Sequence, residues 1–235
     1  DSIRWITGNV NFMVVGTFGG VTRVDGGSRE EAITPTSIRA RPLDFNGVAR
    51  AKPTFALTVP VYLQRGREIL RSLEYDFAAD AYVPVDRNEA ADHLTNRETF
   101  EEVAFQAGRP NLVWVRMSDG SLAALTLKGK DDPTGWQIHR VGGDANIISL
   151  AVLPLENERD RLWFVAERTI NGVTRRYVEY FSEEGEFRDP LDFYEEIDAG
   201  AEEDVFENIQ FQDKLDSHIH LDSVLTFDGA LRGLS

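Results

Sequence analysis

A short hairpin signature returns about every fifty residues along this 235-residue chain. Each copy joins two apolar runs through a turn that contains glycine, and the copies are Phe12–Val24, Val61–Leu70, Leu112–Leu127 and Leu162–Phe181. The turn glycines are 46, 54 and 52 residues apart, at Gly20, Gly66, Gly120 and Gly172. A period of this length built from hairpins is typical of a β-propeller, in which each blade covers its apolar face with the next blade.

The predicted fold is therefore all-β, with propeller-like blades of antiparallel strands and short helical insertions. The predicted units cover residues 1–50, 51–98, 99–144 and 145–198, and residues 199–235 form a linker and the start of a further unit. Propellers usually have four to eight blades. Four units and a partial fifth do not close a ring easily, so the chain is expected to be either a four-bladed ring with a tail or a fragment of a larger propeller within a longer chain, and the second is favoured.

Local signals add detail to this plan. Asn171–Gly172 lies between apolar runs and is the strongest hairpin signal in the chain. The glycines of the Phe18–Gly20 turn are expected to supply positive φ angles. Pro60 predicts an edge strand or a bulge. Helices are predicted at Asp86–Thr95, capped by Asn88, and at Asp189–Ile197. The inner face of the first helix would carry Ala90, Ala91 and Leu94.

Composition limits the possible functions. The chain has no cysteine, which removes disulfides, thiolate metal sites and thiol nucleophiles. No run of 18 apolar residues is present, so no membrane span is predicted. Forty acidic against 25 basic residues give a net charge of −15, which disfavours tight binding of DNA or RNA. The acidic stretch Glu183–Glu207 is either a solvated loop or a negative surface that faces a nucleic acid without gripping it.

One constellation has metal-binding chemistry. On a strand, alternate residues share a side, so Asp216, His218, His220 and Asp222 would point the same way and could hold zinc. The string resembles the opening of amidohydrolases, but those enzymes place it in an α/β barrel, and this chain lacks the strand–helix alternation of such a barrel. A solvated strand face or a subunit contact is therefore favoured. His93 and His139 are interpreted as ordinary histidines.

No other site is predicted. Trp5, Trp114, Trp136 and Trp163 lie on or beside predicted strands, where packing between blades is favoured over a sugar-stacking platform. Paired carboxylates for glycoside hydrolysis remain an alternative, although 40 acidic side chains produce nearly any spacing by chance. The chain has no Gly-x-Ser-x-Gly elbow and no phosphate-binding loop. We therefore predict no catalytic residue, no metal site and no cofactor.

The fourth hairpin carries a family resemblance. Asp160–Phe181 resembles a stretch of large structural proteins of tailed bacteriophages, in which a Leu-Trp-x-Val strand leads to Arg-Thr-Ile-Asn-Gly and then to Arg-Tyr-x-Glu. Further segments fit the same pattern in the same order: Val14–Val24, Ile33–Arg41, Ile69–Asp86, Asn111–Leu127 and Leu221–Gly229. The chain is thus similar to tail nozzle and packaged-DNA stabilisation proteins of short-tailed phages.

This resemblance implies a structural protein of the virion tail, assembled in the host bacterial cytoplasm and without catalysis. It implies a homo-oligomeric ring, a hexamer, below the portal, with the portal or adaptor and tail fibres or spikes as partners. Genomic DNA would pass through the lumen without specific binding, and the ring would aid genome retention and ejection. An acidic lumen, lined for example by Glu183–Glu207, would suit that passage. A carbohydrate-binding or glycoside-hydrolase propeller is the alternative.

Overall fold

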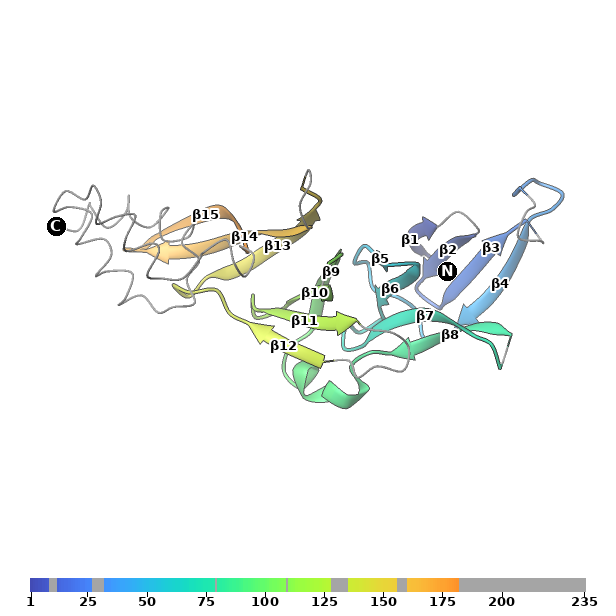
Figure 1. Cartoon of the computed structure of the whole chain (residues 1–235), viewed down its shortest axis with the longest axis horizontal. Helices are drawn as coiled ribbons and strands as arrows, with labels where there is room; N and C mark the ends of the chain where they lie inside the picture. The colour runs from blue at the N-terminus through green and yellow to red at the C-terminus, as the bar shows by residue number, and fades with distance from the viewer. Residues whose placement is uncertain are drawn as a thin grey trace. The chain divides into compact units, whose positions relative to one another are not determined.

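The structure is a computed structural model, and it describes residues 1–8, 12–26, 32–78, 80–108, 110–127, 135–155 and 160–181. These residues form antiparallel sheets and one short helix, so the all-β prediction is confirmed (Figure 1). The chain divides into two compact units, Asp1–His139 and Arg140–Ser235. The predictions for Asp189–Ile197, Glu183–Glu207 and Asp216–Ser223 lie outside the described residues.

The first unit contains three four-stranded sheets in which strands pair in chain order. The first sheet consists of β1 (Ile3–Gly8), β2 (Met13–Thr17), β3 (Val21–Asp25) and β4 (Arg39–Asp44). The second consists of β5 (Thr54–Ala56), β6 (Val59–Leu63), β7 (Leu70–Asp76) and β8 (Ala81–Asp86). The third consists of β9 (Phe100–Gln106), β10 (Asn111–Met117), β11 (Leu122–Leu127) and β12 (Gly135–His139).

The second unit contains the fourth sheet, whose three described strands also pair in chain order. They are β13 (Asn146–Leu153), β14 (Arg161–Ile170) and β15 (Val173–Tyr180). Along β14 every second residue is buried, and these residues are Leu162, Phe164, Ala166 and Arg168. Each of the four sheets lies inside one of the residue ranges 1–50, 51–98, 99–144 and 145–198.

The hairpin turns use glycine in two different ways. Asn171 and Gly172 have φ angles of 52° and 77°, which is the left-handed pair that a type I′ turn requires, as predicted. The prediction of positive φ angles for the Phe18–Gly20 turn is wrong. A Cβ atom on Gly20 would lie 2.2 Å from the backbone oxygen of Asp44, so this glycine allows close approach of two backbone segments.

Pro60 does not mark an edge strand. It lies on β6, which is between β5 and β7, and it pairs with Phe55 of β5 without a register shift. Pairing with β7 begins only at Val61. Pro60 therefore has no pairing partner on β7, and its missing N–H removes no hydrogen bond to that strand. The prediction of an edge or bulge was wrong because an inner strand can still be unpaired on one side at its start.

The predicted helix is a 3₁₀ helix, η1 (Glu89–Thr95), that buries Ala91 and Leu94 but leaves Ala90 exposed. The side chain of Asn88 does not cap it. Instead, Asn88 Oδ1 accepts a hydrogen bond of 2.9 Å from Leu70 N, and Nδ2 donates one of 3.0 Å to Glu68 O. The backbone leaves helical geometry at Ala91, at φ −135° and ψ 37°, which explains why no α-helix forms.

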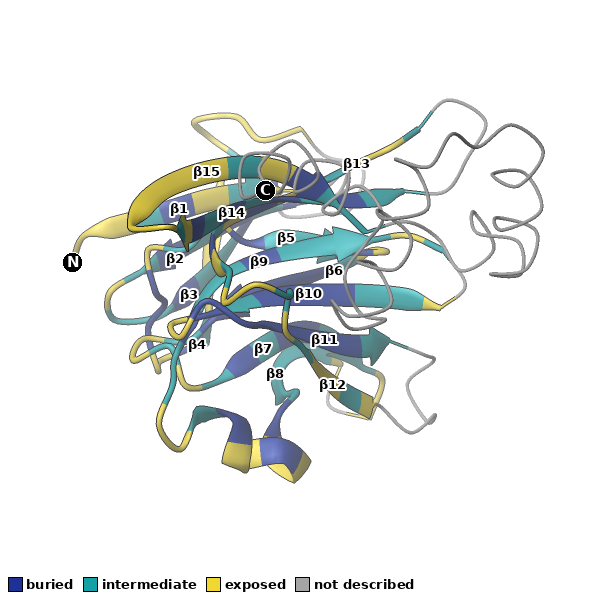
Figure 2. Ribbon diagram, turned by 90° about the vertical axis from the view of Figure 1, so that its left-hand side faces the viewer, coloured by how far each residue is buried: buried dark blue, intermediate teal, exposed yellow. Residues whose placement is uncertain are grey.

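The second sheet is covered on both faces. Tyr62 of β6 packs with Trp5, Val14 and Val21 of the first sheet. Its neighbours Val61 and Leu63 point the other way and pack against the third sheet, whose contributing residues include Phe100, Val103, Val113, Val115 and Leu125. Buried side chains consequently run along β6, β10 and β11 (Figure 2). Each such aliphatic or aromatic side chain contributes roughly 1.5–3 kcal/mol through burial.

Candidate functional site

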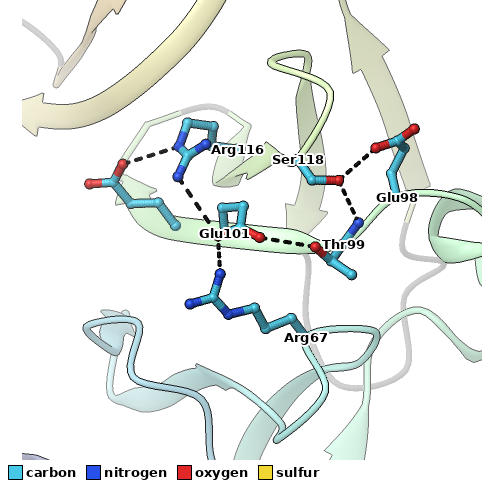
Figure 3. A network of polar contacts seen from close by, with 7 residues as sticks. Arg67, Glu98, Thr99, Glu101, Arg116 and Ser118 are labelled. Carbon is cyan, nitrogen blue, oxygen red and sulfur yellow. Dashed lines mark hydrogen bonds and ion pairs between the residues drawn. The ribbon is translucent and has the colours of Figure 1, made fainter.

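Polar side chains gather where the second and third sheets meet, and we call this group the inter-sheet cluster (Figure 3). It consists of Arg67, Glu98, Thr99, Glu101, Glu102, Arg116 and Ser118. Arg67 belongs to the turn between β6 and β7, while the other members lie on β9, on β10, or beside these strands. The cluster therefore joins one hairpin of the second sheet to two strands of the third.

Glu101 is the centre of the cluster. Arg67 Nη1 donates a hydrogen bond to Glu101 Oε2, and Thr99 Oγ1 donates one of 2.9 Å to Oε1. Arg116 Nη2 lies 4.0 Å from the same Oε2 atom, and Arg116 Nε lies 3.5 Å from Glu102 Oε2. One carboxylate thus links guanidinium groups from two sheets, as Figure 3 shows.

Backbone hydrogen bonds support this link. Phe100 N donates to Arg67 O at 2.8 Å, and Ser118 N donates to Thr99 O at 2.9 Å. Ser118 Oγ accepts from Thr99 N at 2.9 Å and donates to Glu98 Oε2 at 2.6 Å. The segment before β9 is therefore held between the hairpin of its own sheet and the hairpin of the preceding sheet.

The junction of the first and second sheets follows the same backbone scheme. Val48 N donates to Thr17 O at 3.0 Å, and Arg65 N donates to Gly47 O at 3.1 Å. Gly47–Val48 thus corresponds to Thr99–Phe100 in the next junction. The repeated arrangement shows that consecutive sheets are fastened by their hairpin turns, in addition to their apolar contacts.

A buried phenol adds a polar contact between the first two sheets. Tyr62 Oη donates a hydrogen bond of 2.9 Å to Asp44 Oδ2, and both residues are buried. Asp44 Oδ1 accepts from Asn46 N at 2.9 Å and from Asn46 Nδ2 at 2.7 Å. Burial raises the pKa of Tyr62 because it disfavours the phenolate, and the nearby Asp44 carboxylate raises it further.

We expect Tyr62→Phe to lower the free energy of unfolding by about 1–3 kcal/mol, because it leaves a buried oxygen of Asp44 without its donor. Chemical denaturation at neutral pH measures this loss. Tyr75→Phe is the control, since Tyr75 also donates to an aspartate, Asp80, but at an exposed position. A loss as large in Tyr75→Phe would contradict the role given to the buried contact.

The same variant has a pH signature. Above its ordinary pKa of about 10 a tyrosine of the unfolded chain ionises, whereas folded Tyr62 keeps its proton. The stabilisation from Tyr62 is therefore complete below pH 10 and is lost as the pH rises. Tyr62→Phe is expected to show a shallower alkaline decline in stability than the wild type.

The second unit contains a buried ion pair within the hairpin of β14 and β15. Arg168 Nη2 donates a hydrogen bond of 2.9 Å to Glu179 Oε2, and Nη1 donates to Oε1. Arg168 Nε also donates to Gly142 O at 3.3 Å. The guanidinium carbon lies 5.8 Å from the centre of the Tyr177 ring. The first residue of Arg168–Gly172 and the last residue of Arg176–Glu179 are therefore direct partners.

The tryptophans occupy packing positions. Trp5 lies 5.6 Å from the Tyr62 ring between the first two sheets, and Trp136 stacks on Phe100 at 5.7 Å. Trp114 is buried on β10, with Nε1 donating to Gln106 Oε1 at 2.6 Å. Trp163 lies 4.8 Å from the Tyr180 ring in the second unit. The Trp5 pair joins the first two sheets, whereas Trp136 and Phe100 come from the two outer strands of the third sheet.

The histidines of the described region lie apart. His93 is exposed on η1, whereas His139 packs 5.0 Å from the Trp114 ring, and burial lowers the pKa of its imidazole. Among the described residues, no group of three or more His, Asp or Glu side chains could hold a metal ion. The His218 and His220 pair lies beyond the residues that the structure describes.

In the part of the chain that the structure covers, no helix is long and apolar enough to cross a membrane. No protein-family model matches this chain, and no curated protein matches it.

Proposed function

We propose that this chain is a propeller-like structural subunit of a phage tail, acting as a ring-forming scaffold and DNA conduit below the portal. The observation that carries the proposal is the junction between consecutive sheets. In the first unit, antiparallel meanders stack face to face, and each hairpin turn bonds to the segment that begins the next sheet. Face-to-face packing of four-stranded antiparallel sheets is also the arrangement of propeller blades, and it supports the proposal.

The chemistry of the junctions supports a mechanical role. In the inter-sheet cluster, Arg67 and Arg116 both contact Glu101, while Ser118 binds Glu98. The Arg67–Glu101 contact holds the second sheet to the third, and the other contacts link strands and flanking residues within the third sheet. A cross-link of this kind between modules suits the proposed scaffold, which would aid genome retention.

The distribution of charge supports a conduit. Residues 1–139 carry 18 acidic and 16 basic side chains, whereas residues 140–235 carry 22 acidic and 9 basic ones. The net charge is therefore −2 in the first unit and −13 in the second. We infer that the second unit supplies the acidic lining, which repels the phosphate backbone and lets the duplex slide.

Sedimentation velocity over a range of concentrations, combined with negative-stain electron microscopy, tests the ring. We expect closed oligomers of defined size. Duplex DNA is expected to show no saturable binding to them even at low salt, where attraction to a basic surface would be strongest. A strictly monomeric protein, or tight binding of duplex DNA, would overturn the proposal. A monomer that binds oligosaccharides would favour the carbohydrate-binding alternative.

A further inference from the structure

The four sheets share a structurally equivalent first position. In the first three sheets this position pairs with the last residue of the second strand or the residue after it, and its pairs are Ile3 with Thr17, Val48 with Gln64 and Phe100 with Met117. In the fourth sheet β14 continues further, and the equivalent pair beside the register shift is Ile147 with Ala166. In the first, third and fourth sheets a register shift directly follows this pair. The equivalence aligns the remaining positions of the sheets with one another.

Exposure at this position differs in one sheet. Val48, Phe100 and Ile147 are 0% exposed, whereas Ile3 is 61% exposed. Val48 and Phe100 are buried at junctions where their own N–H groups donate to the hairpin of the preceding sheet. Ile3 thus occupies a junction position that is still accessible to solvent.

The strand residues beside Ile3 belong to the same accessible surface. Ile6 pairs with Val15, and Gly8 pairs with Met13, so Ile6, Val15 and Met13 share one face of the first sheet. Ile6 is 56% exposed, and the other two are partly exposed. The position equivalent to Val15 in the second sheet is Tyr62, which is fully buried against the first sheet.

We call Ile3, Ile6, Met13 and Val15 the open face of the first sheet. In the second and third sheets the corresponding face packs against a preceding sheet. The open face therefore has the composition and position of a sheet-packing surface. Exposed apolar surfaces of this kind mark interaction sites.

The fourth sheet has an exposed apolar residue on the face that, in the second sheet, packs against the following sheet. Val178 is 71% exposed and pairs with Val165 on the side opposite the buried Phe164. By the alignment, Trp163 and Val165 correspond to Val61 and Leu63, which pack the second sheet onto the third. We call Trp163, Val165 and Val178 the outer face of the fourth sheet.

We propose that the outer face of the fourth sheet in one copy docks on the open face of the first sheet in a second copy. This inference rests on the proposed function, and it specifies which two surfaces form the interface between neighbouring subunits of the ring. It continues between chains the same sheet-on-sheet packing that joins the first three sheets within a chain. Because the two surfaces differ, the contact is head-to-tail, and repetition closes a ring when the rotation allows it.

Two variants place a charge in each surface, Ile6→Asp and Val178→Asp. We expect each variant to fold and to weaken self-association at least tenfold in sedimentation velocity, because an unpaired carboxylate would be buried in an apolar contact. Ile38→Asp is the matched control, since Ile38 is 53% exposed and lies outside both faces. It is expected to assemble as the wild type does.

Mixing the two variants tests the head-to-tail geometry. The Ile6→Asp copy keeps its outer face, and the Val178→Asp copy keeps its open face. An equimolar mixture is therefore expected to form heterodimers but no larger rings. Absence of heterodimers from a mixture of folded variants would overturn the pairing of these faces.

A thiol probe covers the case in which an aspartate variant does not fold. The chain has no cysteine, so Ile6→Cys introduces a single thiol. Its reaction with maleimide is expected to be fast in dilute monomer and slow in the assembled fraction, while Ile38→Cys reacts fast in both. A thiol at position 6 that is protected already in the monomer would indicate closure within one chain and would overturn the proposal.

The results of these experiments distinguish failure of the proposed contact from failure of the proposed function. Rings that persist in Ile6→Asp and Val178→Asp would overturn this contact and leave the proposed function intact. A wild-type chain that stays monomeric at every concentration would overturn both.

Discussion

Replacing Glu179 with alanine is expected to lower the free energy of unfolding of the second unit by about 3–5 kcal/mol. Arg168 and Glu179 are both buried, so the substitution leaves a guanidinium in the interior without its carboxylate partner. The cost comes mainly from that unpaired charge. Denaturant titration followed by the fluorescence of Trp163, in a variant that retains only this tryptophan, would report on the second unit.

Glu167→Ala is the matched control on the same hairpin. Glu167 Oε2 contacts Arg176 Nε at 2.9 Å, but Arg176 is exposed, so we expect a loss of about 0–1 kcal/mol. Replacing the buried pair together, as Arg168→Met with Glu179→Leu, should recover most of the stability because no charge then remains buried. Equal losses in Glu179→Ala and Glu167→Ala would show that burial of the pair has no special effect.

Gly47→Ala is expected to disrupt the junction of the first and second sheets. Gly47 has a φ angle of +73°, and a Cβ atom there would lie 1.9 Å from the backbone oxygen of Phe18. The left-handed backbone costs an alanine about 1–2 kcal/mol. Relief of the clash adds a further loss of about 1–3 kcal/mol. Thermal denaturation of the two variants, Gly47→Ala and its control, measures the difference.

Gly66→Ala provides that control. Gly66 also has a positive φ angle, +103°, but nothing lies within 4 Å of a Cβ atom placed on it. Its substitution adds no clash and should therefore cost only the backbone contribution. If Gly66→Ala proves as damaging as Gly47→Ala, the close approach to Phe18 is not what requires glycine at position 47.

The sequence predicted the features that depend on neighbouring residues. Asn171–Gly172 formed its hairpin because both residues accept left-handed backbone angles. The spacing of the turn glycines predicted where each sheet lies in the sequence, because a hairpin forms between residues that are close in the chain. Contacts between distant segments were not predictable in this way. Gly20 is required by the carbonyl of Asp44, and Asn88 is diverted from its capping role by Leu70, which is 18 residues earlier.

The same division applies to the candidate site. The turn at Asn171–Gly172 fixes a register that puts Arg168 and Glu179 on one face, and that much could be predicted. Their contact could not, because the register places Glu179 opposite Phe164 and Arg168 opposite Arg175. The inter-sheet cluster could not be predicted either, since Arg67 and Glu101 meet only after two separate sheets have packed. No local pattern distinguishes these side chains from other charges on strand ends.

The linking dipeptides Gly47–Val48 and Thr99–Phe100 each bond to the hairpin of their own sheet and to the hairpin before it. A duplicated gene segment that begins at such a dipeptide would encode a module able to make both sets of bonds as soon as it is translated. Insertion or removal of a whole module of about fifty residues at these links is therefore expected to preserve both sets of bonds, while a break elsewhere in the period would separate a strand from its partners.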